Sequence, residues 1–121
     1  MLFRSFQLVD DVLDYSGDEA ATGKHLGDDL AEGKPTLPLI QAMKHGSATQ
    51  SACVRHAIET GGREALPGVL AAIRATGALD ETRCHAEAEA RLALAAVAPL
   101  PASTFKDSLV QLASFAVARD F

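Results

Sequence analysis

Glycine and proline divide this chain into segments of helical length. No segment alternates between apolar and polar residues with the period of two that is typical of a β-strand. The predicted helices cover residues 2–15, 37–45, 48–60, 63–76, 79–97 and 104–119. Each of the first five is followed within two residues by a glycine or a proline, the residues that commonly end helices. The sequence therefore predicts an all-α fold, a helical bundle.

Hydroxyl side chains precede three of these helices. Thr36, Ser47 and Ser103 occupy positions where a side-chain oxygen can accept a hydrogen bond from a free backbone N–H of the first turn. Pro38 and Pro67 fall early in their helices, where a missing N–H is tolerated. We therefore expect capped helix starts after residues 36, 47 and 103.

The first predicted helix carries three carboxylates, Asp10, Asp11 and Asp14, among apolar residues. At spacings of three and four residues we expect all three to project from one side of the helix, where like charges repel each other. Asp14 also lies near the C-terminal end, where the helix dipole disfavours an acid. Together these effects cost about 1 kcal/mol unless a cation offsets them. A divalent metal ion with oxygen ligands would do so.

The segment 16–36 is a predicted loop that contains four glycines, with Asp28 and Asp29 able to start a short helical turn. Lys24 and Lys34 lie among the glycines, and lysines with glycine-flanked amides suit an anion such as phosphate. Carboxylates lie beside a phosphate only with a cation between them. Mg²⁺ binds one or two carboxylates, waters and substrate phosphates. The residue types thus favour a diphosphate–Mg²⁺ site over the alternative, a solvated acidic helix face.

Composition excludes several other functions. The net charge of −5 and the absence of a basic run argue against nucleic-acid binding. Half of the 16 acidic residues lie in the first 34 residues, so we expect the functional site in that part of the chain. The longest apolar stretch, residues 92–100, is too short to span a bilayer, and the N-terminus does not read as a signal peptide. We expect a cytoplasmic protein without a transmembrane segment.

The two cysteines do not indicate a disulfide framework or a zinc site. Cys53 precedes His56 by one helical turn, and Cys84 is followed by His85. The two pairs are far apart in sequence and lie in the middle of predicted helices, which does not match the spacing of zinc ligands. Buried thiols and surface imidazoles are the preferred interpretation.

Four stretches together resemble one family. They are residues 6–15 (FQLVDDVLDY), 23–24 (GK), 27–30 (GDDL) and 32–39 (EGKPTLPL). They are similar to the second aspartate-rich motif, and the loop after it, of the trans-polyprenyl diphosphate synthases, the polyprenyl synthetase family. The resemblance is closest to the bacterial octaprenyl branch, and the helical remainder is compatible with it. It implies the all-α isoprenoid synthase fold.

The resemblance also implies a prenyltransferase of isoprenoid biosynthesis. Such an enzyme condenses isopentenyl diphosphate with an allylic diphosphate, and Mg²⁺ draws off the diphosphate leaving group. By position in the motif, Asp10 would be the direct Mg²⁺ ligand, while Asp11 and Asp14 would act mainly through metal-bound water. Lys24 would contact the allylic diphosphate.

Further roles follow from the same resemblance. Phe6 and Gln7 would line the reacting centre, and Lys34 would help to bind substrate. Asp28 is an additional candidate. The family also has a first aspartate-rich motif and upstream basic residues for isopentenyl diphosphate, and no second DDxxD occurs in these 121 residues. The chain is therefore expected to be the C-terminal part of a single synthase domain, inactive alone. Residues 1–39 would form the motif helix and diphosphate loop, and residues 40–121 the supporting helices.

Two alternatives stay open. The chain could be a non-catalytic helical subunit that complements a partner chain carrying the first motif, or associates with itself as a dimer. It could also be a helical domain whose acidic motif no longer binds a ligand.

Overall fold

The structure is a computed structural model that describes residues 2–16 and 25–119. All regular secondary structure in these residues is helical, so the predicted all-α class is confirmed. The elements are α1 (Leu2–Ser16), α3 (Asp28–Ala31), α4 (Leu37–His45), α5 (Ala48–Thr60), the 3₁₀ turn η1 (Arg63–Ala65), α6 (Leu66–Thr76), α7 (Ala78–Val97) and α8 (Thr104–Ala118).

One predicted helix start was wrong. We expected an α-helix from residue 63, but Arg63–Ala65 forms a 3₁₀ turn and the α-helix begins at Leu66. An α-helix starting at 63 would require the N–H of residue 67 to bond the carbonyl of residue 63, and Pro67 has no N–H. In the observed helix Pro67 lies in the first turn, where no such bond is needed.

Two of the three predicted caps are confirmed. Ser47 and Gln50 form a reciprocal capping box, and the Ser103 hydroxyl accepts a hydrogen bond from the Lys106 N–H at 3.1 Å. Thr36 does not cap α4 with its side chain. Its backbone carbonyl instead accepts from the N–H of Leu39 at 3.0 Å.

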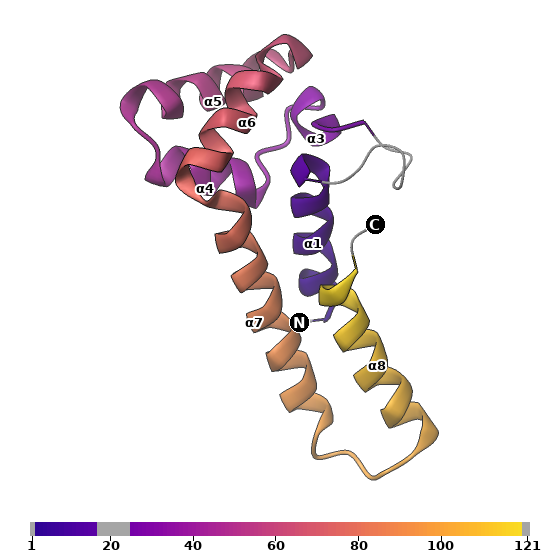
Figure 1. Cartoon of the computed structure of the whole chain (residues 1–121). Helices are drawn as coiled ribbons and strands as arrows, with labels where there is room; N and C mark the ends of the chain where they lie inside the picture. The colour runs from indigo at the N-terminus through magenta and orange to yellow at the C-terminus, as the bar shows by residue number, and fades with distance from the viewer. Residues whose placement is uncertain (1, 17–24, 120–121) are drawn as a thin grey trace.

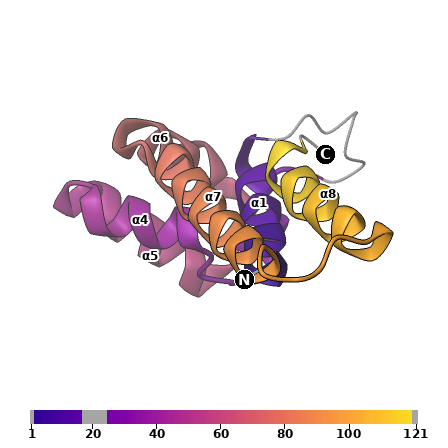
Figure 2. The ribbon, with the colours of Figure 1, turned by 90° about the horizontal axis from the view of Figure 1, so that it is seen from below.

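The helices form two groups that meet along α7. In both views α1 lies between α7 and α8 (Figures 1 and 2). Helices α4, α5 and α6 gather around the start of α7 in Figure 1 and lie across α7 from α8 in Figure 2. Helix α1 packs most extensively against α7. Helix α8 runs back antiparallel to α7, so its C-terminal end comes to lie beside α1 (Figure 1). This return places residues from the two ends of the sequence next to each other.

A hydrophobic core fixes the last turn of α1 and the short helix α3 against α4, α5 and α6. The core cluster consists of Tyr15, Leu30, Leu39, Ala42, Val54, Ala57, Val69, Ala72, Ile73 and Ala78. Burying a leucine or valine side chain contributes about 1.5–3 kcal/mol. Along α7, the buried Ala86, Ala90 and Ala93 allow a close approach of the neighbouring helices. The C-terminal end of α1, which carries the aspartates, is therefore fixed in place by this core.

None of the helices in residues 2–16 and 25–119 combines the length and the apolar character that crossing a bilayer requires.

Candidate functional site

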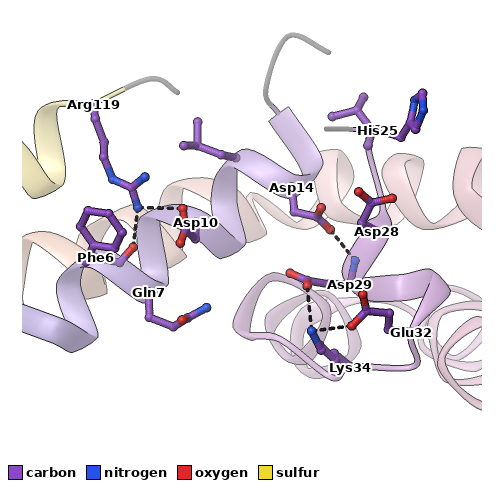
Figure 3. A pocket seen from close by; sticks show the side chains of 12 residues that line it. Phe6, Gln7, Asp10, Asp14, His25, Asp28, Asp29, Glu32, Lys34 and Arg119 are labelled. Atoms are coloured by element: carbon purple, nitrogen blue, oxygen red, sulfur yellow. Dashed lines mark hydrogen bonds and ion pairs between the residues drawn. The ribbon is translucent and has the colours of Figure 1, made fainter. Parts of the chain in front are cut away.

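A cavity of about 450 Å³ lies between α1, α3 and the end of α8 (Figure 3). It is lined by Phe6, Gln7, Asp10, Leu13, Asp14, His25, Leu26, Asp28, Asp29, Glu32, Lys34 and Arg119. Five of these side chains are carboxylates, and only Lys34 and Arg119 carry a fixed positive charge. The cavity therefore has an excess of negative charge.

Asp10 is paired with an arginine from the far end of the chain. Arg119 Nη2 donates to Asp10 Oδ1 at 2.9 Å and to the backbone carbonyl of Phe6 at 2.7 Å. The Arg119 guanidinium lies 3.7 Å from the centroid of the Phe6 ring, in cation–π contact. The Arg119 side chain is 5% exposed, whereas that of Asp10 is 34% exposed and remains open to the cavity (Figure 3).

Asp11 does not line the cavity, which corrects the expectation that all three aspartates share one side. It is buried, and Gln7 Nε2 donates to its Oδ1 at 3.0 Å. Burial raises the pKa of Asp11, and the hydrogen bond from Gln7 opposes this effect. Asp11 is offset from Asp10 by about 100° around the helix axis, so the packing of α1 can bury Asp11 while Asp10 and Asp14 line the cavity.

Asp14 joins α1 to α3. Its Oδ2 accepts a hydrogen bond from the backbone N–H of Asp29 at 3.1 Å, and its backbone carbonyl accepts from the Gly27 N–H at 2.9 Å. Burial raises the pKa of Asp14 to about 6, the hydrogen bond from Asp29 opposes the shift, and the negative charges of Asp29 and Asp28 add to it. The Asp14 carboxylate thus lies in a site that disfavours its charge.

The remaining charges come from α3 and the segment after it. Asp28 forms an ion pair with Arg63, and Lys34 forms ion pairs with Glu32 and with Asp29, the latter at 3.8 Å. The Lys34 side chain is 57% exposed, and its pKa is raised first by the hydrogen bond to Glu32 and then by that carboxylate's charge. Lys34 therefore presents a positive charge at the rim of the acidic cavity.

The structure brings most of the predicted site residues together. The cavity is lined by Phe6, Gln7, Asp10, Asp14, Asp28 and Lys34. Lys24 lies outside the described residues. The roles assigned to these side chains stay predictions.

Sequence reasoning assigned no role to Asp29, Glu32 or Arg119. Asp29 and Glu32 belong to the loop pattern that carried the family resemblance, which was the available signal for them. Arg119 had no signal, because it lies 109 residues from Asp10 and only the fold joins them.

The described side chains fit a hard cation completed by a second ligand. Within residues 2–16 and 25–119, no three His, Cys, Asp or Glu side chains are grouped closely enough to hold a metal ion by themselves. Asp10 and Asp14 nevertheless both present carboxylate oxygens to the cavity. Mg²⁺ typically uses one or two carboxylates and takes its other ligands from water and substrate phosphates. The arrangement suits such an open site better than a closed metal cage.

The all-α fold and the cavity lined by aspartates can now be compared with known protein families. The sequence profile of the Polyprenyl synthetase family matches residues 3–74, which is more than half of the chain. The chain belongs to the polyprenyl synthetase family, as the resemblance predicted.

Individual relatives agree with this assignment. The chain is 52% identical over 118 residues to the octaprenyl diphosphate synthase of Haemophilus influenzae, covering 97% of this chain and 36% of that protein. It is 51% identical over 117 residues to the octaprenyl diphosphate synthase of Escherichia coli, covering 96% and 36% of the two chains. The chain thus spans about a third of the length of these curated relatives.

A solved structure supports the fold. The polyprenyl synthase of Caulobacter crescentus, crystallised in complex with calcium and isoprenyl diphosphate, superposes with a TM-score of 0.87 at 38% identity. The match covers 99% of this chain and 37% of that one. The all-α fold of this chain is therefore the fold of the corresponding part of a polyprenyl synthase.

Proposed function

We propose that this chain supplies part of the active site of a Mg²⁺-dependent prenyltransferase that condenses isopentenyl diphosphate with an allylic diphosphate. The observation that carries the proposal is the cavity in which Asp10 and Asp14 of α1 face the carboxylates of α3. The names of the octaprenyl relatives support the reaction class. The calcium and isoprenyl diphosphate bound to the Caulobacter enzyme support the ligand chemistry.

The charge balance of the cavity supports a metal–diphosphate ligand. Five carboxylates attract a divalent cation and repel a bare diphosphate, so a diphosphate would enter with its cation. Asp10 would hold the cation directly and Asp14 mainly through metal-bound water, and Lys34 would pair with a diphosphate oxygen at the rim. The Phe6 ring would give an apolar wall beside the allylic group. Bound Mg²⁺ would stabilise the negative charge that develops on the leaving diphosphate.

Asp11 and Gln7 would act differently from Asp10. Because Asp11 is buried and accepts a hydrogen bond from Gln7, its carboxylate would reach a metal only through water. The burial of Asp11 is what supports proposing for it the indirect role that the family resemblance implies.

The chain is proposed to be the C-terminal part of a single synthase domain and to be inactive alone. It spans about a third of the length of its relatives. It contains one DDxxD motif, at residues 10–14, and no other that could face it across a substrate. A prenyltransferase assay of the purified 121-residue chain with farnesyl and isopentenyl diphosphates tests this point. Measurable chain elongation would overturn it.

A second candidate is a subunit that completes its site with another chain. Large apolar side chains lie open on α1 and α8: Phe3 of α1 is 81% exposed and Phe105 of α8 is 82% exposed. Such side chains are typical of contact surfaces when they gather in a patch. Light scattering of the purified chain tests self-association, and a monomer at micromolar concentration would count against it.

The binding proposal is tested with Mn²⁺ and inorganic pyrophosphate as probes. Isothermal titration of the full chain should show that Asp10→Asn weakens Mn²⁺-dependent pyrophosphate binding at least tenfold, since a neutral amide replaces a charged ligand. Asp107→Asn, on the exposed surface of α8, is the matched control and should leave binding unchanged. Equal binding by the wild type and Asp10→Asn would favour a motif that no longer binds a ligand.

A further inference from the structure

The contact between Arg119 and Asp10 fixes the end of α8 to α1. Arg119 is the residue that follows the last turn of α8, and one of its guanidinium nitrogens reaches both the Phe6 carbonyl and the Asp10 carboxylate. The side chain is almost fully buried and lies over the Phe6 ring. A planar guanidinium is well suited to combine a carboxylate pair with an aromatic face.

The same contact uses an oxygen of the proposed cation ligand. Asp10 Oδ1 already accepts from Arg119 at 2.9 Å, so a cation on this carboxylate would lie within a few ångströms of the guanidinium. Two positive charges at that separation repel each other strongly at the intermediate dielectric of a half-buried site. One carboxylate therefore cannot bind both partners as well as it binds either one.

Asp14, the other cavity-lining member of the motif, is held in a different way. Its carboxylate accepts from the backbone N–H of Asp29, and an amide dipole repels a cation far less than a guanidinium does. The competition is thus specific to Asp10 and to the junction between α1 and α8.

We propose that Arg119 is a positioning residue that competes with the divalent cation for Asp10, so that cation binding weakens the attachment of the end of α8 to α1. This inference rests on the proposed function of Asp10 as a cation ligand. Without a cation, Arg119 neutralises Asp10 and closes one side of the cavity. With a cation bound, the guanidinium leaves the carboxylate, and the last turn of α8 loses this one of its contacts with α1.

The first experiment measures Mn²⁺ binding to the full 121-residue chain by electron paramagnetic resonance, with Mn²⁺ alone as the probe. Arg119→Gln should bind Mn²⁺ roughly tenfold more tightly than the wild type, because the competing charge is gone. Arg119→Lys should return the affinity toward the wild-type value, because the charge is restored. Arg91→Gln, on the exposed surface of α7, is the matched control and should change nothing.

These outcomes separate competition from a structural role. A merely structural arginine would weaken Mn²⁺ binding when it is replaced, so equal or weaker binding by Arg119→Gln overturns the proposal. If Asp10→Asn binds Mn²⁺ as well as the wild type, the proposed function of Asp10 fails instead. If neither the wild type nor Arg119→Gln binds Mn²⁺, both proposals are wrong.

The second experiment measures hydrogen exchange of the backbone amides of residues 112–119. Without metal, Asp10→Asn should exchange faster there than the wild type, because the ion pair between Arg119 and Asp10 has been lost. Saturating Mg²⁺ should speed exchange in the wild type and have no further effect in Arg119→Gln. Unchanged or slower exchange in the wild type, at a Mg²⁺ concentration that binds, would show that the cation does not weaken the attachment of α8 to α1.

Discussion

The acidic cavity and the hydrophobic core meet at two consecutive residues of α1. Asp14 faces the cavity, and Tyr15 belongs to the core cluster, where it is 4% exposed. The rotation of about 100° per residue is what allows one helical turn to serve both regions. The core holds the turn in place, and the cavity takes its geometry from that turn.

The two regions differ in what they contribute to stability. In the core, removal of apolar side chains from water favours the folded state. In the cavity, the raised pKa of Asp14 means that folding disfavours the charged carboxylate. We therefore expect core substitutions to lower stability, whereas substitutions of the aspartates that line the cavity should spare stability or raise it while they weaken cation binding.

The largest effect is expected from truncating the core. Leu39→Ala removes a fully buried side chain of the cluster and should lower the free energy of unfolding by about 3 kcal/mol. Urea denaturation followed by circular dichroism measures the change. Leu92→Ala is the matched control, because Leu92 is 54% exposed on α7 and its loss should cost less than about 0.5 kcal/mol. Equal costs for the two variants would mean that the core does not dominate stability.

The charge of Asp14 should make stability depend on pH. Its pKa of about 6 in the folded state exceeds the ordinary value of 3.8, so the folded state binds the proton more tightly than the unfolded state. The contribution of this group therefore favours folding at low pH and is lost as the pH rises through about 6, a difference of about 2 kcal/mol between pH 4 and pH 7.

The comparison that isolates this group is wild type against Asp14→Asn. The variant keeps an oxygen for the Asp29 N–H but cannot ionise, so it should be the more stable protein at pH 7 and lose its advantage toward pH 4. Urea titrations at both pH values measure the difference. An advantage that is the same at pH 4 and pH 7 would argue against an ionised, buried Asp14.

A comparable effect is expected where the end of α5 packs against α3, the short helix beside the cavity. Gly61 ends α5 with φ of +62°, and an added Cβ would lie 3.0 Å from the carbonyl oxygen of Ala31 in α3. Gly61→Ala should cost about 2 kcal/mol, from backbone strain plus this contact. Gly77→Ala is the control, because Gly77 has φ of +66° but open space around it, and should cost only about 1 kcal/mol. Thermal unfolding of both variants measures their losses of stability. Equal losses would show that α3 moves away from the added Cβ without a cost in stability.

The smallest change in stability is expected at Lys34. Its side chain is 57% exposed, and exposed ion pairs contribute little, so Lys34→Ala should leave the urea midpoint unchanged. Binding of pyrophosphate with Mn²⁺ should nevertheless weaken several-fold, because the charge at the rim is lost. Calorimetric titration measures this, and unaltered binding would remove Lys34 from the substrate-binding residues.

The helices could be predicted well because their boundaries depend on local interactions. Ser47 and Gln50 cap α5 within a span of four residues, and Gly61 ends it, so the segment 48–60 was predicted with its observed bounds. The start of α6 was predicted at residue 63, but the helix begins at Leu66. The pattern of helical residues did not show that the missing N–H of Pro67 prevents an α-helix from starting at residue 63.

The site could be predicted only in part. The motif indicated Asp10, Asp11 and Asp14 as a group, but the rotation of α1 against α3 decides that only Asp10 and Asp14 line the cavity. Asp11 is turned toward Gln7, a neighbour on its own helix. The family resemblance supplied the chemistry of the group, and packing supplied its orientation.

The sequence by itself determined the all-α class, most helix boundaries and the family, because each depends on residues a few positions apart or on a contiguous motif. Only the tertiary structure decided that Arg119 pairs with Asp10 and that the Asp14 carboxylate accepts a hydrogen bond from the Asp29 N–H. These contacts join residues 109 and 15 positions apart. They form because the core orients α1 and α3, and because α8 returns along α7 to bring its end beside α1 (Figure 1).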